Sequence, residues 1–315
     1  MHVGDDANLL TARVATAVAS LGALAERGVA LGPLTTYRVG GRAAVFVRAR
    51  TRDDLVRVGV AAQASGLHVL PIGRGSNLLI ADAGFDGIAV TLVDLVDTLD
   101  IEPGNAVVTA SAGSSLPVVA RKTAAAGLTG FEWAVGVPGS IGGAVRMNAG
   151  GHGSDMAGSL IEVTIVDLVA NCERNVPAAD IGLSFRHSEL PASAVVVEAR
   201  LQLAHGDRGE SERMISEIVS WRRANQPGGQ NAGSVFVNPV PGEVSAGALI
   251  DAAGLRGMRV GSAYVSHKHA NFIQVDDGGS ADDVRALMQI VSDRVESTSG
   301  YALRSEIRLV GFRGH

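Results

Sequence analysis

The stretch 135–153 constrains this chain more than any other part of its sequence. It carries glycines at Gly136, Gly139, Gly142, Gly143, Gly150, Gly151 and Gly153. Glycine loses more backbone entropy on folding than any other residue, so this density is unfavourable in an ordinary packing segment. It suits a place where backbone approaches another molecule, and N–H groups exposed at a helix start bind phosphate or pyrophosphate. The alternative is a flexible linker, but Val135, Ile141 and Val145 supply apolar anchors that linkers lack.

Composition narrows the class of protein. The chain has 315 residues, of which 46% are hydrophobic and 19% charged, which is typical of globular proteins with two or three domains. A net charge of −5 argues against a broad nucleic-acid surface. The single cysteine, Cys172, excludes an internal disulfide and favours a reducing compartment. The N-terminus is acidic and we expect no apolar run of membrane-spanning length, so the expected location is the cytoplasm.

Periodicity and punctuation predict α/β character in the first half of the chain. We expect a helix over 8–25, a strand over 43–48, a helix opened by a capping box at Thr51 and a short strand over 68–72. Strands are expected over 88–92, 98–101, 107–111, 161–168 and 194–203, and a helix over 116–126. The composition changes near residue 204, which we interpret as a domain boundary.

Beyond that boundary we expect further helices and short strands. The helices cover 211–225 and 246–253, and a last helix runs from a cap at Ser280 to Ser299. The strands cover 234–237, 260–265 and 271–275, with a closing strand over 303–309.

Two glycine loops offer the clearest chemistry. Residues 73–78 and 136–150 both lie at predicted strand ends and together could hold the pyrophosphate of a dinucleotide. Neither contains Gly-x-Gly-x-x-Gly in one βαβ unit, and no P-loop motif is present. His267 and His269 stand two apart without clear carboxylate partners, so we predict no metal site.

Three further segments combine polar and apolar residues, around Arg186, Ser234 and Glu306. Each has an ordinary structural interpretation. Arg186 would then be a surface ion-pair residue, Ser234 a turn residue and Glu306 an exposed strand residue. Spacing alone does not assemble them into one site.

Taken in order, however, the segments resemble one family. They are Thr35-Thr36-Tyr37-Arg38-Val39-Gly40-Gly41, Gly73-Arg74-Gly75-Ser76-Asn77-Leu78-Leu79, Gly136-Val137-Pro138-Gly139-Ser140-Ile141-Gly142-Gly143-Ala144 with Met147-Asn148-Ala149-Gly150, Phe185-Arg186-His187-Ser188, Gly233-Ser234-Val235-Phe236 with Asn238-Pro239, Ser266-His267-Lys268-His269-Ala270-Asn271-Phe272, and Glu306. From about residue 34 to residue 311 the chain resembles the UDP-N-acetylenolpyruvoylglucosamine reductases, also called UDP-N-acetylmuramate dehydrogenases. Each motif is modestly specific, and the ordered set is very specific.

The resemblance implies an α+β fold with a two-lobed FAD-binding domain of the vanillyl alcohol oxidase (PCMH) type and a C-terminal α/β substrate-binding domain. The implied ranges are 1–33 for an N-terminal helix and linker, 34–204 for the FAD domain with lobes of about 34–87 and 88–204, and 205–315 for the substrate domain. FAD is the implied cofactor and NADPH the electron donor. The implied partners are NADPH and a UDP-sugar only, with no nucleic acid, membrane or protein.

The implied reaction reduces an enolpyruvyl ether to a lactyl ether for peptidoglycan synthesis. Arg186 matches the family's catalytic arginine, whose planar fork would stabilise a developing enolate. Glu306 would assist as a protonated acid that donates a hydrogen bond, and Ser234 would give a proton to the α-carbon.

The remaining implied site residues fall into two groups. The cofactor would contact Tyr37, Gly73, Arg74, Gly75, Ser76, Asn77, Leu78, Gly136, Val137, Pro138, Gly139, Ser140, Gly143 and Asn148. The UDP-sugar would contact Asn238, Arg256, Lys268, His269, Asn271 and Arg222.

Some positions depart from the wider family. Phe185 stands where a tyrosine is usual, and Val237 where a lysine often precedes Asn-Pro. The short segment after Ser188 leaves no room for a substrate-covering loop, so the chain resembles the shorter, second type of the family. Two alternatives stay open: another FAD oxidoreductase of the same fold, which would not need both Ser234 and Glu306, and a nucleotide-sugar binding protein that has lost its chemistry.

Overall fold

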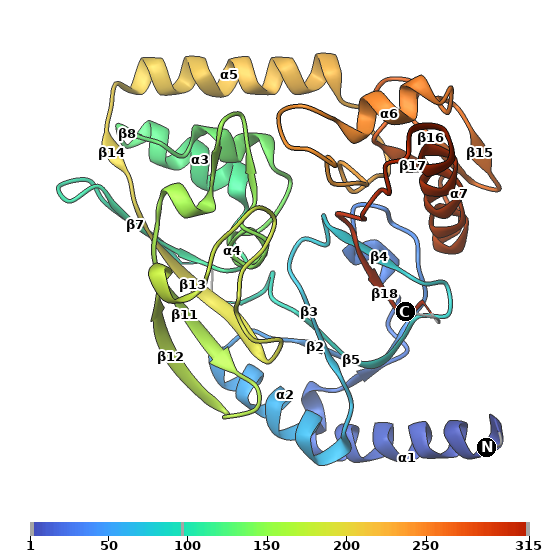
Figure 1. Ribbon diagram of the computed structural model, residues 1–315. Helices are drawn as coiled ribbons and strands as arrows, with labels where there is room; N and C mark the ends of the chain where they lie inside the picture. The colour runs from blue at the N-terminus through green and yellow to red at the C-terminus, as the bar shows by residue number, and fades with distance from the viewer. Residues whose placement is uncertain (1–2, 96–97, 313–315) are drawn as a thin grey trace. The chain divides into compact units, whose positions relative to one another are not determined.

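The computed structural model describes residues 3–95 and 98–312 and divides into two compact units (Figure 1). The first unit comprises Met1–Val29, Ala44–Arg74 and Asp86–Trp221, and the second comprises Ala30–Ala43, Gly75–Phe85 and Arg222–His315. The predicted domains follow the chain in order, whereas two early segments pack with the C-terminal unit. The predicted domain ranges remain predictions, and residues 1–2, 96–97 and 313–315 within them lie outside the described part.

One layer of the first unit is an antiparallel five-stranded sheet. Its order is β12 (Cys172–Pro177), β11 (Leu160–Asp167), β13 (Ala194–Gln202), β7 (Val107–Ser111) and β6 (Leu99–Glu102). Inward residues such as Val163, Ile165 and Ala199 are fully buried against α3 (Leu116–Ala125) and α4 (Ile141–Arg146). Pro117 lies in the first turn of α3, where its missing N–H is harmless. This core supports the residues that follow β7 and α3, including the glycine stretch.

The other layer of the first unit is a smaller sheet covered by helices. Its order is β1 (Glu26–Arg27), β2 (Ala43–Arg48), β5 (Phe85–Thr91) and β3 (Val69–Ile72). The helix α2 (Arg52–Ser65) has the predicted capping box at Thr51 and ends at Gly66 with φ +68°. Two-residue strands pair beside these layers: β8 (Leu128–Thr129) with β14 (Ala204–His205), and β9 (Gly150–Gly151) with β10 (Ser154–Asp155).

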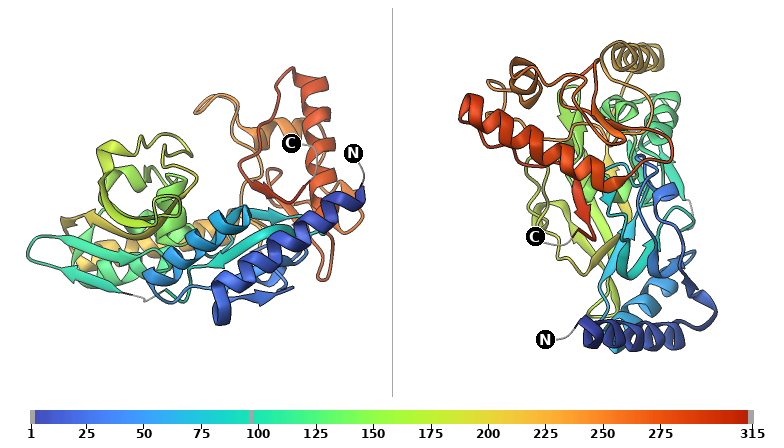
Figure 2. Two further views of the ribbon diagram at one scale, coloured as in Figure 1. Left: turned by 90° about the horizontal axis from the view of Figure 1, so that it is seen from below. Right: turned by 90° about the vertical axis from the view of Figure 1, so that its right-hand side faces the viewer.

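The helix α1 (Val3–Leu21) packs on α2 through Val14, Ala17 and Leu21 (Figure 2). Leu24, which we expected inside this helix, instead belongs to a 3-10 turn, because Gly22 adopts φ +58°. By length and composition alone, the window Ala7–Leu24 could cross a membrane, with mean hydropathy 1.3 and 17% of it buried. This corrects the expectation that no run is long enough. A single such helix near the N-terminus is weak evidence for a span.

The second unit is built around a three-stranded sheet and a long helix. The sheet order is β15 (Arg259–Val260), β16 (Ala263–Val265) and β17 (Ile273–Val275). The helix α7 (Ala281–Ser299) packs on it, starting at the Ser280 cap and ending at Gly300 as predicted. Helix α6 (Ala246–Ala252) completes this core, and β18 (Arg308–Val310) pairs in parallel with β4 (Leu78–Ile80). Helix α5 (Arg208–Asn225) contains the boundary between the units.

Three predicted strands of the second unit are wrong. The expected strand over 260–265 is two short strands, β15 and β16, which pair in antiparallel. The segment 234–237 forms only an isolated bridge between Phe236 and Ser305, since Gly233 turns the backbone at φ +79° just before it. The closing strand begins at Arg308 instead of residue 303, so Glu306 precedes the strand. Here the Ser305 hydroxyl bends back to the Ile307 carbonyl at 2.8 Å, and this local bond competes with a regular ladder.

Candidate active site

The glycine stretch 135–153 is an ordered segment that contains helical structure. It runs from η3 (Glu132–Gly136) into α4, which Ser140 caps through Gly143 N–H. The N–H groups of Ile141 and Gly142 donate to the carbonyls of Ser114 and Ala112 at 3.0 and 2.9 Å. A Cβ on Gly142 would lie 2.8 Å from Ala112 Cβ. Part of the glycine content therefore serves helix packing, and these N–H groups, contrary to expectation, are already used.

The other glycine loop offers the free donors. In the described part of the chain, none of the backbone N–H groups of residues 73–77 donates a hydrogen bond. Gly75 adopts φ +60°, and a Cβ there would lie 2.2 Å from the Leu34 carbonyl oxygen. A Cβ on Gly73 would lie 2.3 Å from Ser140 Oγ, so the two predicted loops meet at this point. Successive unpaired N–H groups in a glycine turn fit a pyrophosphate.

Arg186 lies at the tip of a tight turn in the first unit. Ser184 and His187 exchange two backbone hydrogen bonds of 3.0 and 3.1 Å across it. Arg186 has φ +56°, a left-handed conformation that is strained for a residue with a side chain. Its Nη1 donates to the Gly150 carbonyl at 3.2 Å, and its guanidinium carbon lies 5.6 Å from the exposed Phe185 ring centre. The turn therefore presents a half-buried guanidinium in one fixed place.

Asn148 holds this turn from the glycine stretch. Its Nδ2 donates to the Ser184 carbonyl at 3.1 Å and to Asp155 Oδ2 at 3.0 Å, and its Oδ1 accepts from Ala157 N–H at 2.9 Å. The residue is 4% exposed. Every amide atom is thus used inside the protein, which disagrees with the predicted contact to the cofactor. No local pattern predicts this link, because Asn148 and Ser184 are 36 positions apart in the chain.

Ser234 and Glu306 come together in the second unit. Glu306 N–H donates to the Val235 carbonyl at 2.8 Å, and Val237 N–H donates to the Arg304 carbonyl at 2.9 Å. Both Ser234 and Glu306 are half-buried. The pairing places the two predicted catalytic residues on adjacent segments.

The glycine loop joins the same group of segments. Asn77 Nδ2 donates to the Glu306 carbonyl at 3.0 Å, and Arg308 N–H donates to the Asn77 carbonyl at 3.0 Å. The structure therefore brings residues 75–77, Glu306 and Ser234 into one unit, while Arg186, Gly73 and residues 136–148 belong to the other.

Tyr37 corrects a sequence-based prediction. It is 0% exposed in the core of the second unit, and its hydroxyl donates to the Ile273 carbonyl at 3.1 Å. Burial raises the pKa of its phenol well above the ordinary value. A side chain without exposed surface cannot touch a cofactor, so Tyr37 is a core residue beside the loop.

The predicted substrate residues all lie in the second unit, and several are engaged with protein partners. Arg256 forms two contacts with Asp251, of 2.5 and 3.1 Å, and Asn238 Oδ1 accepts from Ala246 N–H at 3.0 Å. Lys268 Nζ donates to the Arg223 carbonyl at 2.5 Å. The side chain of Arg222 donates to Gln226 Oε1 at 2.8 Å, and burial lowers the pKa of its guanidinium.

His269 and Asn271 form a small polar pair. His269 Nδ1 accepts from Asn271 N–H at 3.2 Å, which leaves the proton of the neutral ring on Nε2. Burial and, less strongly, the charge of Arg256 lower the pKa of His269. The side chain of Asn271 is 4% exposed and bonds to Phe236, so direct contact with a substrate is not available to it. Within the described residues no cluster of metal-ligating side chains occurs, and Cys172 is exposed.

Comparisons with known proteins agree with this arrangement. Residues 43–170 match the family described as FAD binding domain, and residues 225–310 match the C-terminal domain of UDP-N-acetylenolpyruvoylglucosamine reductase. A reductase of that name from Gloeobacter violaceus is 42% identical over 289 residues, covering 91% of this chain and 96% of the relative. One from Acidiphilium cryptum is 40% identical over 284 residues, covering 90% of each chain.

A solved structure gives the same result. The crystal structure of UDP-N-acetylenolpyruvylglucosamine reductase (MurB) from Thermus caldophilus aligns with a TM-score of 0.76 at 32% identity, over 91% of this chain and 98% of that one. The fold and loops define an α+β flavoprotein oxidoreductase that uses FAD. The chain belongs to the UDP-N-acetylenolpyruvoylglucosamine reductase family.

Proposed function

We propose that this protein uses NADPH and FAD to reduce the enolpyruvyl ether of UDP-N-acetylglucosamine to UDP-N-acetylmuramate, a peptidoglycan precursor. One observation carries the assignment of the chemistry. The backbone pairing of Glu306 N–H with the Val235 carbonyl, at 2.8 Å, supports it, because it puts Glu306 and Ser234 on neighbouring segments. Another oxidoreductase of this fold does not need that pair.

The residues present fit FAD. The free N–H groups of residues 73–77 would hold its diphosphate. When bound, FAD supplies the hydride for the β-carbon of the enolpyruvyl group. The chain's own residues must then stabilise negative charge on the substrate and deliver one proton.

Arg186 is proposed to meet the substrate carboxylate as charge develops on it. A guanidinium forms two parallel hydrogen bonds to a carboxylate, and one fixed in advance needs no reorganisation during the reaction. The left-handed turn, the bond that Asn148 donates to Ser184 and the bond that Arg186 donates to Gly150 supply that fixation. Losing one such preorganised donor typically lowers turnover by about a hundredfold to a thousandfold.

Ser234 is proposed to give its proton to the α-carbon, and Glu306 to donate a hydrogen bond to the enol. A serine hydroxyl is a weak acid, so its placement decides the rate of proton transfer. Asn238 and His269 are proposed to contact the UDP-sugar. Arg256 would contact the UDP-sugar only after losing part of its ion pair with Asp251.

We also infer the setting in which the protein works. Its two small-molecule reactants, its single cysteine and its net charge of −5 favour a cytoplasmic protein that needs no nucleic acid, membrane or protein partner.

An anaerobic stopped-flow experiment tests the function in two steps. NADPH first reduces the bound flavin, and the UDP-enolpyruvyl sugar is then added while the flavin absorbance is followed. We expect rapid reduction followed by return of the oxidised band. Ser234→Ala should keep the first step and slow the second by about a hundredfold or more. If Ser234→Ala reoxidises at the wild-type rate, Ser234 is not the proton donor.

A further inference from the structure

Asn271 makes an unusual pair of contacts with the segment that carries Ser234. Its Nδ2 donates to the Phe236 carbonyl at 2.8 Å, and its Oδ1 accepts from Phe236 N–H at 3.0 Å. One amide side chain therefore satisfies both backbone groups of one residue, as a neighbouring strand would. Its own backbone carbonyl accepts from Val235 N–H at 2.9 Å. Three hydrogen bonds thus run from Asn271 to the two residues that follow Ser234.

The opposite edge of this segment is held by the Glu306 segment. Glu306 N–H donates to the Val235 carbonyl, and Val237 N–H donates to the Arg304 carbonyl. Residues 235–237 therefore lie between Asn271 on one edge and the Glu306 segment on the other. Residues 235–237 form only an isolated bridge, and Gly233, which precedes Ser234, has φ +79° and open space where a Cβ would lie. Without Asn271, one edge of the segment would lose both hydrogen bonds to Phe236. The backbone next to Ser234 would then be free to shift.

We propose that Asn271 is a positioning residue that holds the Ser234 hydroxyl at the reacting carbon, an inference that rests on the function proposed above. Asn271 is 4% exposed and both atoms of its amide are engaged, so it acts through the Ser234 segment and not by touching substrate. Proton transfer depends steeply on the distance between donor and acceptor. A shift of this backbone should therefore affect the step that needs the proton, and leave flavin reduction by NADPH intact.

The experiment compares Asn271→Leu, Asn271→Asp and the control Asn105→Asp in the full-length, FAD-loaded protein. Asn105 lies in an exposed turn of the first unit. For Asn271→Leu we expect flavin reduction within about twofold of the wild-type rate, and reoxidation by the UDP-enolpyruvyl sugar slowed at least about tenfold. The solvent deuterium isotope effect on reoxidation should rise, because proton transfer becomes limiting. Equal slowing of both steps would mean that Asn271 is merely structural and would overturn the proposal.

Asn271→Asp supplies a readout that a loss of stability would not give. An ionised carboxylate cannot donate to the Phe236 carbonyl, whereas a protonated one can donate and accept as the amide does. Burial raises the pKa of a carboxyl group, so protonation is reached under mildly acidic conditions. Reoxidation relative to wild type should recover as the pH falls from 8 to about 5.5. Dividing by the wild-type rate removes the titrations that the two proteins share, and His269, whose Nδ1 accepts from the Asn271 N–H, is the titratable group in direct contact with the new carboxyl residue. Absence of recovery would contradict the proposal.

A double variant separates this proposal from the proposed function. If Asn271 acts through Ser234, Ser234→Ala with Asn271→Leu should reoxidise no more than about threefold slower than Ser234→Ala alone. Multiplying effects would overturn the positioning role while leaving Ser234 as the donor. If Ser234→Ala itself does not slow reoxidation, Ser234 is not the proton donor, and the role proposed for Ser234 fails instead.

Discussion

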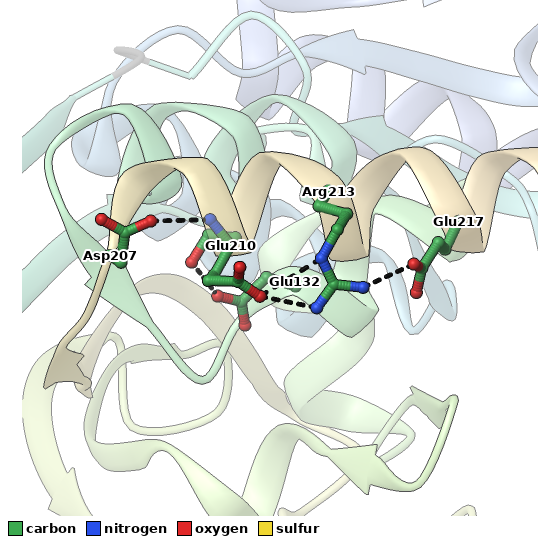
Figure 3. A network of polar contacts seen from close by, with 6 residues as sticks. Glu132, Asp207, Glu210, Arg213 and Glu217 are labelled. Carbon is green, nitrogen blue, oxygen red and sulfur yellow. Dashed lines mark hydrogen bonds and ion pairs between the residues drawn. The ribbon is translucent and has the colours of Figure 1, made fainter.

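Glu132 accepts a hydrogen bond of 2.6 Å from the hydroxyl of Ser211, which lies 79 positions further along the chain (Figure 3). Glu132 is 4% exposed at the start of η3, and Ser211 lies in the first turn of α5. The other carboxylate oxygen of Glu132 accepts from Gly130 N–H at 2.8 Å. This buried carboxylate therefore fixes the beginning of α5 to the segment that leads into the glycine stretch.

Replacing Ser211 should destabilise the first unit. Burial alone would raise the pKa of Glu132, but hydrogen bonds from Ser211, Thr129 and Gly130 outweigh it and lower that pKa. Ser211→Ala should lower the free energy of unfolding by about 1.5–3 kcal/mol, as for a lost hydrogen bond to a charged group. A depressed carboxyl pKa stabilises the fold above the unfolded pKa of about 4.3, and this is lost on acidification. The difference between variant and wild type should therefore shrink below about pH 4. Urea unfolding of the flavin-free protein measures this difference in the free energy of unfolding.

The matched control is Ser216→Ala, on the exposed face of the same helix. Its hydroxyl only bonds back to the Glu212 carbonyl at 2.8 Å. We expect a change within about 0.5 kcal/mol. Equal effects of the two substitutions would show that Glu132 does not anchor the helix.

The basic residue His269 predicts a second dependence of folding stability on pH. Because its pKa is lowered in the folded protein, the unfolded chain binds more protons between the two pKa values. The contribution of His269 to stability is complete above about pH 6.5 and declines as the pH falls through this range. His269→Asn keeps an acceptor near Nδ1 and should lose less stability than wild type between pH 7 and 5.5. The control variant His205→Asn makes the same replacement at an exposed histidine on strand β14.

Asn148 is expected to control turnover and not flavin binding. Asn148→Ala removes the bonds to Ser184 and Asp155, so the Arg186 turn loses its support. Turnover should fall at least about tenfold while the dissociation constant for FAD stays within about threefold of wild type. The comparison variant Asn175→Ala, on strand β12, should change neither turnover nor the dissociation constant for FAD. Flavin loss as the main effect of Asn148→Ala would restore the cofactor contact predicted from sequence.

Gly75 should not tolerate a side chain. Alanine there would need φ +60° and would place its Cβ 2.2 Å from the Leu34 carbonyl oxygen. We expect Gly75→Ala to lose FAD on gel filtration and to unfold at lower temperature, whereas Gly104→Ala has nothing within 4 Å of its Cβ and should be neutral or slightly stabilising. FAD retention by Gly75→Ala at the wild-type level would argue against the loop as the diphosphate site.

Features encoded by neighbouring residues were predictable from sequence. The capping box at Thr51, the cap at Ser280 and the strand Ala43–Arg48 all appear where local chemistry placed them. Such features depend on contacts within a few residues, so a single sequence contains their signal. The ordered motifs likewise identified the family correctly.

What escaped prediction depends on contacts between distant segments. The two residues that follow Ser234 are held by Asn271 and Glu306, and neither partner can be read from the local pattern. Tyr37 belongs to a conspicuous motif, yet it packs in the core against residues far along the chain. The same holds for Asn148, whose partner Ser184 defines its role. The residue types predicted that these positions are important. They did not indicate which distant residues these positions contact.

The parallel pairing of β4 with β18 sets an order of events during protein synthesis. In the neighbouring link, the Asn77 side chain bonds to Glu306 across 229 positions, so this part of the second unit stays incomplete until residues 306–310 leave the ribosome. At ordinary translation speeds the wait is roughly 10 to 50 seconds. During that interval the buried side chains of Leu79 and Ile80 lack their final partner, while the sheets of the first unit can already form. A nascent chain that stops before β18 therefore exposes an apolar strand, however well its first unit has folded.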